Sequence, residues 1–426
     1  MYWTVHMYGC PRRVNHAAVA IGTSIFTFGG YCSGIDYKNL QPIDIHILDT
    51  VKLNWRKLEL INQDCMCVPF QRYGHTAINH GSNIYLWGGR NDNEACNTLY
   101  CFNTKTLKWT KPSVYGNIPE PRDGHSACII ENCMYIFGGF EEHSGLFASD
   151  LYMLNLHSMV WSIVKTEGRP PTYRDFHTAT AIDNKMYIFG GRSDYHAPRQ
   201  TDQDKYCSDI YYLDTSRRKW IRPKVYGTKP IARRSHSACM PKLFTKNTIM
   251  LLINIGLITV VYNGFFYIFG GFNKNKNLHF QDINRYDPVS STWMKILPKG
   301  IPPCARRRQI CQLVNDRVYI SGGASPISPK PAITARLREY DLDNQLNNIQ
   351  LENHDDLHVL DLKPSLKDMC MVNVWENMEA MEIDNIHDLN IPLSLKHDLA
   401  AFEPFEVMYI GVNMMQSYDD NFPVLA

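Results

Sequence analysis

Arginine and histidine recur in this sequence at a spacing that raises the question of catalysis. In "YRDFHTATAIDNKMYIFGGR", an R-x-x-H motif formed by Arg174 and His177 stands thirteen residues before the Gly-Gly pair that begins at Gly190. Histidine is the side chain that most readily gains and loses a proton near neutral pH, so one such residue could serve an enzyme. The motif, however, is repeated. The other histidines in this position are His16, His75 and His125, and the arginines three residues before them are Arg13, Arg72 and Arg122.

These motifs belong to a repeat of roughly 50 residues that predicts a β-propeller. Its Gly-Gly pairs begin at Gly29, Gly88, Gly138, Gly190, Gly270 and Gly322. Each pair is followed by a polar loop, an alternating strand such as "DLYMLNL" and, in five repeats, a tryptophan. Four short strands with glycine and aromatic residues at fixed places are typical of a propeller blade. We predict an all-β fold, a six-bladed propeller whose recurring arginines and histidines are scaffold residues, so that none of the histidines is catalytic.

Two repeats depart from the pattern. The sixth keeps its arginine as Arg306 but has Gln309 in place of the histidine. In the fifth, His236 precedes Gly270 by 34 residues, thirteen plus 21, which indicates an insertion of 21 residues at about Met240–Val260. Its apolar run is interrupted by Asn254 and is too short for a comfortable membrane span of about 20 residues.

We interpret this insertion as a retained intron or a gene-model error, because a hydrophobic insert in an exposed turn has no evident purpose. If so, transcript reads will run from the codon for Cys239 directly to the codon for Val261. Reads that always contain the intervening codons would contradict this interpretation.

The propeller is expected to occupy residues 1–364, followed by a short helical tail at 365–400 and a poorly ordered C-terminal extension at 401–426. Trp3 has no repeat before it, and we expect it to complete the last blade and close the ring. The chain of 426 residues has a net charge of +2, which gives no global argument for binding nucleic acid or an anionic membrane. Thirteen cysteines without a C-x-x-C pair indicate reduced thiols, and no signal peptide is evident, so we expect a cytoplasmic and nuclear protein without a metal or cofactor.

One face of the propeller is predicted to bind a ligand. The first strand of each blade begins after R-x-x-H and the second ends at Gly-Gly, and antiparallel pairing brings these two ends to the same face. That face collects basic, acidic and flat apolar side chains. The basic residues are Arg90, Arg192, Arg199, Arg234 and Arg307, with Arg12 and Arg308 nearby; the acidic ones are Asp123 and Asp175, with Glu141 and Glu142; Tyr73 and Phe176 are aromatic. Arginines bind carboxylates through paired hydrogen bonds, so this face predicts a peptide that carries both charges, held in part by its C-terminal carboxylate.

The tail has apolar residues at helical spacing. Leu366, Cys370 and Val374 fall four residues apart, and Ile391, Leu395 and Leu399 repeat that spacing, with Pro392 at a helix start. Two short amphipathic helices with nothing left in the propeller to cover them suggest docking onto a partner. A tail that folds back on the last blade is the alternative.

Sequence motifs in both parts resemble a known family. "RYGHTAINHGSNIYLWGGRND" and its relatives resemble kelch repeats, "SLKDMCMVNV" resembles the BC-box that binds elongin, and "IPLSLKHDL" is similar to a cullin-2 box. Together they resemble the kelch substrate receptors of cullin-2 RING ubiquitin ligases. The resemblance implies that the chain is not an enzyme itself but recruits proteins for ubiquitin-dependent degradation, with elongin B, elongin C and cullin-2 with its RING subunit as partners.

The resemblance also implies a substrate class, C-terminal degrons that end in glycine, often with a basic residue just before it. Arg192 and Arg234 then occupy the positions expected to bind the carboxylate, and Asp123 or Asp175 the position for the basic residue. Other kelch proteins are copper oxidases, but the converging Tyr, His and Cys ligands that they need are not visible here. No BTB domain precedes the blades, which argues against a cullin-3 adaptor. A kelch scaffold that binds chromatin, with a role in meiotic recombination, or the cytoskeleton is the serious alternative.

Overall fold

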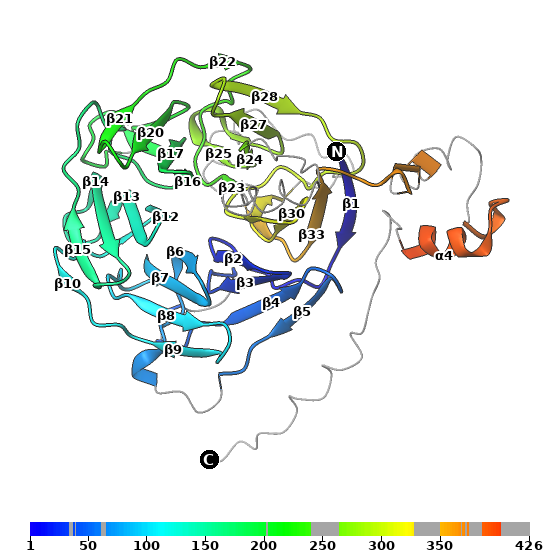
Figure 1. Ribbon diagram of the computed structural model, residues 1–426, viewed down its shortest axis with the longest axis horizontal. Helices are drawn as coiled ribbons and strands as arrows, with labels where there is room; N and C mark the ends of the chain where they lie inside the picture. The colour runs from blue at the N-terminus through cyan, green and yellow to red at the C-terminus, as the bar shows by residue number, and fades with distance from the viewer. Residues whose placement is uncertain are drawn as a thin grey trace, which may run out of the picture.

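A computed structural model describes residues 1–33, 37–38, 40–60, 65–201, 203–239, 264–327, 350–367, 369–370, 373–374 and 386–401. Six sheets, each containing four antiparallel strands and two of them extended by short additional strands, are arranged around a central axis, as Figure 1 shows face-on. The predicted six-bladed propeller is therefore confirmed.

Blades one to three are continuous in sequence. Their strands are β2 (Ala17–Ile21), β3 (Ser24–Phe28), β4 (Ile45–Asp49) and β5 (Asn54–Lys57); β6 (Tyr73–His80), β7 (Asn83–Arg90), β8 (Tyr100–Asn103) and β9 (Lys108–Thr110); and β12 (Ser126–Ile130), β13 (Cys133–Glu141), β14 (Leu146–Asn155) and β15 (Val160–Ile163). Short strands β10 (Tyr115–Gly116) and β11 (Arg122–Asp123) join blade three, and a 3-10 turn, η1 (Cys65–Cys67), precedes blade two.

Blades four to six carry additional hairpins. Their strands are β16 (Thr178–Ile182), β17 (Lys185–Phe189), β20 (Ile210–Asp214) and β21 (Lys219–Ile221); β23 (Ser237–Cys239), β24 (Phe266–Phe269), β27 (Ile283–Asp287) and β28 (Thr292–Ile296), with β22 (Tyr226–Gly227); and β29 (Ile310–Val314), β30 (Arg317–Ser321), β33 (Leu357–Asp361) and β1 (Tyr2–Met7). The hairpins are β18 (Arg192–Asp194) with β19 (Asp204–Tyr206), β25 (Phe272–Asn273) with β26 (Leu278–His279), and β31 (Ala324–Pro326) with β32 (Leu351–Asn353), and η2 (Lys274–Lys276) lies between β25 and β26.

The N-terminal strand closes the ring. β1 pairs antiparallel with β33, with Trp3 opposite Leu360 and His6 opposite His358. Blade six is thus built from both ends of the propeller, as the unpreceded Trp3 predicted.

The core consists of one apolar cluster in each interface between blades. The tryptophan of an outer strand packs against the aromatic residue that precedes Gly-Gly in the blade before it. The ring centroids are 5.7 Å apart for Trp109 and Phe28, 5.7 Å for Trp161 and Trp87, 5.3 Å for Trp220 and Phe137, 4.9 Å for Trp293 and Phe189, and 6.4 Å for Trp3 and Phe269. Large rings in these wedges bury apolar area between adjacent blades, together with the aliphatic residues of each cluster.

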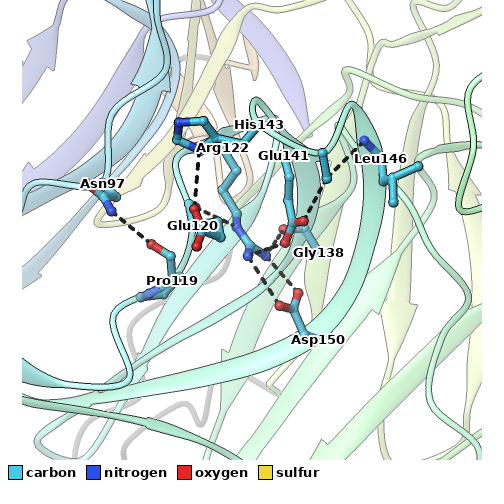
Figure 2. Close-up of polar contacts among 10 residues, drawn as sticks. Asn97, Pro119, Glu120, Arg122, Gly138, Glu141, His143, Leu146 and Asp150 are labelled. Carbon is cyan, nitrogen blue, oxygen red and sulfur yellow. Dashed lines mark hydrogen bonds and ion pairs between the residues drawn. The ribbon is translucent and has the colours of Figure 1, made fainter.

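The recurring arginines are scaffold residues, as predicted. Arg122 is fully buried; its Nη1 donates to the carbonyl oxygen of Gly138 at 3.2 Å and to Asp150 at 2.7 Å, and its Nη2 donates to Glu141 at 2.7 Å (Figure 2). The same bond from arginine to the carbonyl of the first glycine recurs in four further blades, from Arg72, Arg174, Arg233 and Arg306. These side chains therefore fix the start of the first strand to the end of the second.

The Gly-Gly pair is required where blades crowd together. Gly138 has φ +64°, and a Cβ there would lie 2.8 Å from the carbonyl oxygen of Arg174 in the next blade. Gly139 has φ +101°, and its Cβ would lie 2.9 Å from the Cβ of His125 in its own blade. A side chain at Gly138 would push blades three and four apart, and a side chain at Gly139 would push apart the first two strands of blade three.

Three of the recurring histidines join their blade to the one before it. Nε2 of His125 lies 2.8 Å from the hydroxyl of Thr76, Nε2 of His177 lies 2.7 Å from that of Ser126, and Nε2 of His236 lies 3.0 Å from that of Thr178. In blade six, Gln309 Nε2 donates to the hydroxyl of Ser237 at 3.1 Å, so the amide replaces the imidazole.

Several sequence predictions concern segments outside the described residues. The insertion at Met240–Val260 falls within 240–263, part of the predicted helical tail falls within 375–385, and most of the C-terminal extension falls within 402–426. On both sides of the insertion the strands pair normally, because Ser237 lies opposite Phe269 as Thr178 lies opposite Phe189 in blade four.

The tail has its own small core. η5 (Ile386–Asp388) and α4 (Leu393–Ala401) pack on each other, and Ile386, Leu389 and Leu399 are buried together. Helix α4 begins directly after Pro392, whose carbonyl accepts hydrogen bonds from the backbone N–H groups of Leu395 and Lys396. Among the described residues, no helix is both long and apolar enough to cross a membrane.

The scaffold histidines predict that acid destabilises the propeller. Burial lowers the pKa of His125 and of His236 to about 3, and lowers the pKa of His75 and His177 well below 6.5. The unfolded chain takes up these protons near pH 6.5 and the folded chain does not, so stability is complete above pH 6.5 and is lost as the pH falls. Between pH 6.5 and 5 each such histidine costs about 2 kcal/mol, which urea unfolding across this range will measure.

His125→Gln is the matched variant, because Gln309 already fills the equivalent position in blade six. This variant is expected to fold, and unfolding it in acid should take up about one proton fewer than unfolding the wild type, so its free energy of unfolding should depend less on pH. An unchanged slope in this variant would contradict the assignment.

Candidate functional site

The loop face of the propeller holds a basin built from three equivalent positions in every blade. The wall residues stand second in the R-x-x-H motif, the ring residues stand third, and the lip residues follow Gly-Gly. The wall is Val14, Tyr73, Asp123, Asp175, Arg234 and Arg307; the ring is Asn15, Gly74, Gly124, Phe176, Ser235 and Arg308; the lip is Tyr31, Arg90, Phe140, Arg192, Phe272 and Ala324. Each wall residue pairs in register with the lip residue of its own blade, as the predicted antiparallel geometry requires.

The ring is closed by backbone hydrogen bonds. The N–H of each ring residue donates to the carbonyl of the ring residue in the preceding blade, from Gly74 to Asn15 and onward until Asn15 donates to Arg308, over 2.7–3.1 Å. All six residues have positive φ, including Phe176 at 48° and Arg308 at 63°. The ring and the scaffold histidines line a central cavity of about 150 Å³. Arg308 also lines a neighbouring cavity of about 400 Å³, between blades one and two, with Tyr31 and Tyr73.

Three arginines on one side of the basin have no carboxylate partner among the described residues. Arg234, Arg307 and Arg308 each have a buried Nε atom without a hydrogen-bond acceptor. Burial, with the other arginines of the basin, lowers the pKa of Arg234 and lowers that of Arg307 to about 10. The basin therefore has an unbalanced positive charge before any ligand arrives.

Aromatic rings support these guanidinium groups. The Cζ atoms of Arg307 and Arg234 lie 4.5 Å and 5.9 Å from the centroid of Phe272, and that of Arg308 lies 5.5 Å from Phe176. Arg308 Nη1 also donates to the hydroxyl of Tyr31 at 2.6 Å. Cation–π contacts hold the charges in place without neutralising them.

Two other predicted site arginines, Arg192 and Arg90, lie at the lip and are paired. Arg192 forms an ion pair with Asp175 and lies 3.8 Å from Asp204. Arg90 lies 3.1 Å from Glu142. Arg199 is exposed in the loop between β18 and β19, where its backbone bridges to Leu146 of blade three. The structure thus places Arg234 and Arg307 together with Arg308 as the free cations, and gives Arg192 a partner within the protein.

The acidic side of the basin contains one unpaired carboxylate. Asp175 is buried and held by Arg192, and Glu141 is held by Arg122. Asp123 is 8% exposed, and no described residue donates a hydrogen bond to it. Burial, followed by the charge of Asp175, raises the pKa of Asp123 to about 7.

Sequence reasoning noticed Arg308 but did not select it, and it missed Tyr31 and Phe272. A signal for all three was present. Arg308 immediately follows the selected Arg307, and both aromatic residues follow Gly-Gly directly, which is the position already assigned to this face.

A cluster of possible metal ligands lies outside the basin, in blade six, where β1 pairs with β33. Suitable atoms of His6, Asp356 and His358 lie within 4.8 Å of one another. Both Asp356 oxygens, however, already accept from Arg306 at 2.5 and 2.7 Å, and the two imidazoles stack at 4.1 Å. A guanidinium bound to the carboxylate disfavours a second cation at this place.

The tail presents part of its predicted docking residues to solvent. Leu366 is 73% exposed and Cys370 is exposed, whereas Val374 packs against the small core of the tail. In the second predicted motif Pro392 is exposed and Leu395 is 40% exposed, but Leu399 is buried in that core and Ile391 packs against it.

Comparison with known proteins finds kelch-repeat relatives over most of the chain. Residues 74–323 match the family described as the KLHDC2/KLHL20/DRC7 kelch-repeats domain. The chain is 44% identical to kelch domain-containing protein 3 of Homo sapiens and of Bos taurus over 377 residues, which cover 87% of this chain and 90% of each relative. It is 27% identical to host cell factor of Drosophila melanogaster over 318 residues, 72% of this chain and 20% of that protein.

Replacement of arginine by glutamine should have opposite effects in the scaffold and in the basin. Arg307→Gln removes an uncompensated cation and should raise the free energy of unfolding by about 1 kcal/mol. Arg122→Gln leaves Asp150 and Glu141 without their donor and should lower it by about 3–5 kcal/mol. Urea unfolding at pH 7.5 measures both, and a loss of stability in Arg307→Gln similar to that in Arg122→Gln would show that Arg307 is also scaffold.

Proposed function

The chain belongs to the kelch-repeat family that includes kelch domain-containing protein 3, and on this basis we propose that it is the substrate-recognition subunit of an elongin B–C and cullin-2 E3 ubiquitin ligase. Kelch propellers are generally non-catalytic interaction modules. In this proposal the basin binds a C-terminal degron of a substrate protein, and the tail connects the propeller to the ligase.

The observation that carries the proposal is the group of three unpaired arginines, Arg234, Arg307 and Arg308. A chain terminus supplies the carboxylate that they lack, and the charge-assisted bonds would form in a half-buried site where water competes weakly. Because the central cavity is only about 150 Å³, a terminal residue without a side chain suits it, which favours glycine. Asp123 offers a partner for a basic side chain close to the terminus.

The exposed part of the tail supports the second half of the proposal. Leu366 and Cys370 are apolar or weakly polar groups one helical turn apart, both open to a partner. An elongin subunit would cover them, and cullin-2 would approach the exposed side of α4 near Leu395.

Co-expression with elongin B–C tests the ligase connection. The wild-type chain should co-purify with elongin B–C, and Leu366→Ser and Cys370→Asp should reduce recovery at least about tenfold because they place polar groups in an apolar contact. Leu297→Ser is the control, since Leu297 is 81% exposed on the propeller and its replacement should change nothing. Equal recovery of all four chains, or of none, would contradict the role of the tail.

Peptide binding by the purified protein tests the basin. A fluorescent peptide ending in Lys-Gly should bind with a free C-terminus and lose about 30-fold in affinity when amidated, which corresponds to about 2 kcal/mol for charge-assisted bonds. Arg234→Gln and Arg308→Gln should produce losses of similar size. Arg12→Gln is the control, because Arg12 is exposed and paired with Asp355. Equal binding of the free and amidated peptides would exclude carboxylate recognition.

A further inference from the structure

The unpaired carboxylate of Asp123 calls for an explanation. The Asp123 side chain is about nine-tenths buried and accepts no hydrogen bond from a described residue, so keeping it ionised is costly. The space that it occupies is made by Gly74 of the preceding blade, where a Cβ would lie 3.2 Å from Asp123 Oδ2. Gly74 is a ring residue that lines the central cavity, so Asp123 lies at the edge of the proposed ligand site.

The charged and titratable groups around Asp123 come from every neighbouring blade. They are Asp175 of blade four, Arg90 and Tyr73 of blade two, Glu142 directly after β13, and Arg308 of blade six across the basin. Four of them are already engaged. Asp175 binds Arg192, Arg90 binds Glu142, and the Tyr73 hydroxyl donates to Asp92 at 3.1 Å. None of the described groups is therefore placed to neutralise Asp123 fully.

We propose that the proton on Asp123 switches the basin between a form that selects a peptide with a basic side chain next to its terminus and a form that does not. The proposal rests on the proposed function, because it requires that the basin bind peptide termini. It adds a regulatory property to that site, a dependence of substrate choice on pH.

The direction of the effect follows from the charges. Burial and the neighbouring Asp175 raise the pKa of Asp123 to about 7. Above this pH the carboxylate is ionised and attracts a lysine or arginine side chain. Below it the group is neutral, and a basic peptide must displace a proton in order to gain the same ion pair. A peptide with an uncharged side chain at that position has no such requirement, so its affinity should change little.

The test compares two peptides that differ only in the penultimate residue, Lys-Gly and Met-Gly, by fluorescence anisotropy between pH 6 and pH 8. If only the ionised form favours lysine, the ratio of the two affinities should rise about tenfold across this range. In Asp123→Asn, which resembles the protonated form, the ratio should be low and constant. Asp49→Asn is the control, because it removes a carboxylate from a turn outside the basin, where Asn103 already makes the equivalent hydrogen bonds in blade two, and it should retain the rise.

The possible outcomes distinguish failure of the pH switch from failure of the proposed degron binding. A constant ratio in the wild type, with binding that still requires a free C-terminus, would overturn the switch and leave degron binding intact. A pH-dependent ratio that persists in Asp123→Asn would assign the proton to another group and also overturn it. If neither peptide binds in free or amidated form, both proposals fail.

Discussion

Six peptide hydrogen bonds, each from one blade to the blade before it, hold the centre of this molecule in place. They form a closed circle through the ring residues, and they are possible only because all six adopt positive φ. A left-handed backbone at a phenylalanine or an arginine is unfavourable by about 1 kcal/mol or more, so the surrounding blades must enforce it. The scaffold arginines and the Gly-Gly pairs hold the blades in the arrangement that keeps the ring residues at positive φ.

Because the circle fixes the backbone, the wall positions can vary without disturbing the fold. Blades three and four place aspartates at the wall and blades five and six place arginines there, on the same local geometry. Arginine accordingly has two roles in this chain. Five arginines each donate to a glycine carbonyl, and Arg122, Arg233 and Arg306 also bind carboxylates. Arg234, Arg307 and Arg308 have neither kind of partner among the described residues. The first group stabilises the propeller, and the second leaves positive charge on the basin.

The repeat period was sufficient to predict the blades, the ring closure through Trp3 and the shared face of wall and lip. The pairing of individual charges was harder to predict. Asp175 and Arg192 were both assigned to this face, but only the strand register shows that they lie opposite each other and form an ion pair. Arg192 also lies near Asp204, which belongs to a hairpin outside the repeat pattern. One structural motif was also missed. A glycine stands seven residues after a tryptophan at Gly116, Gly168, Gly227 and Gly300, and each packs against the backbone oxygen of the tryptophan in the following blade, Trp161, Trp220, Trp293 and Trp3.

Closure of blade six by β1 has a consequence for biosynthesis. Thr4 of β1 and its partner Val359 are separated by 355 residues, so β1 leaves the ribosome long before the strand with which it pairs. At typical translation rates that interval lasts roughly 20 to 70 s, during which Trp3 and its neighbours have no blade to join. Residues 365 onward emerge directly after β33 ends at Asp361. A nascent chain therefore presents its proposed ligase-binding segment only when the strand that seals the propeller has already been made.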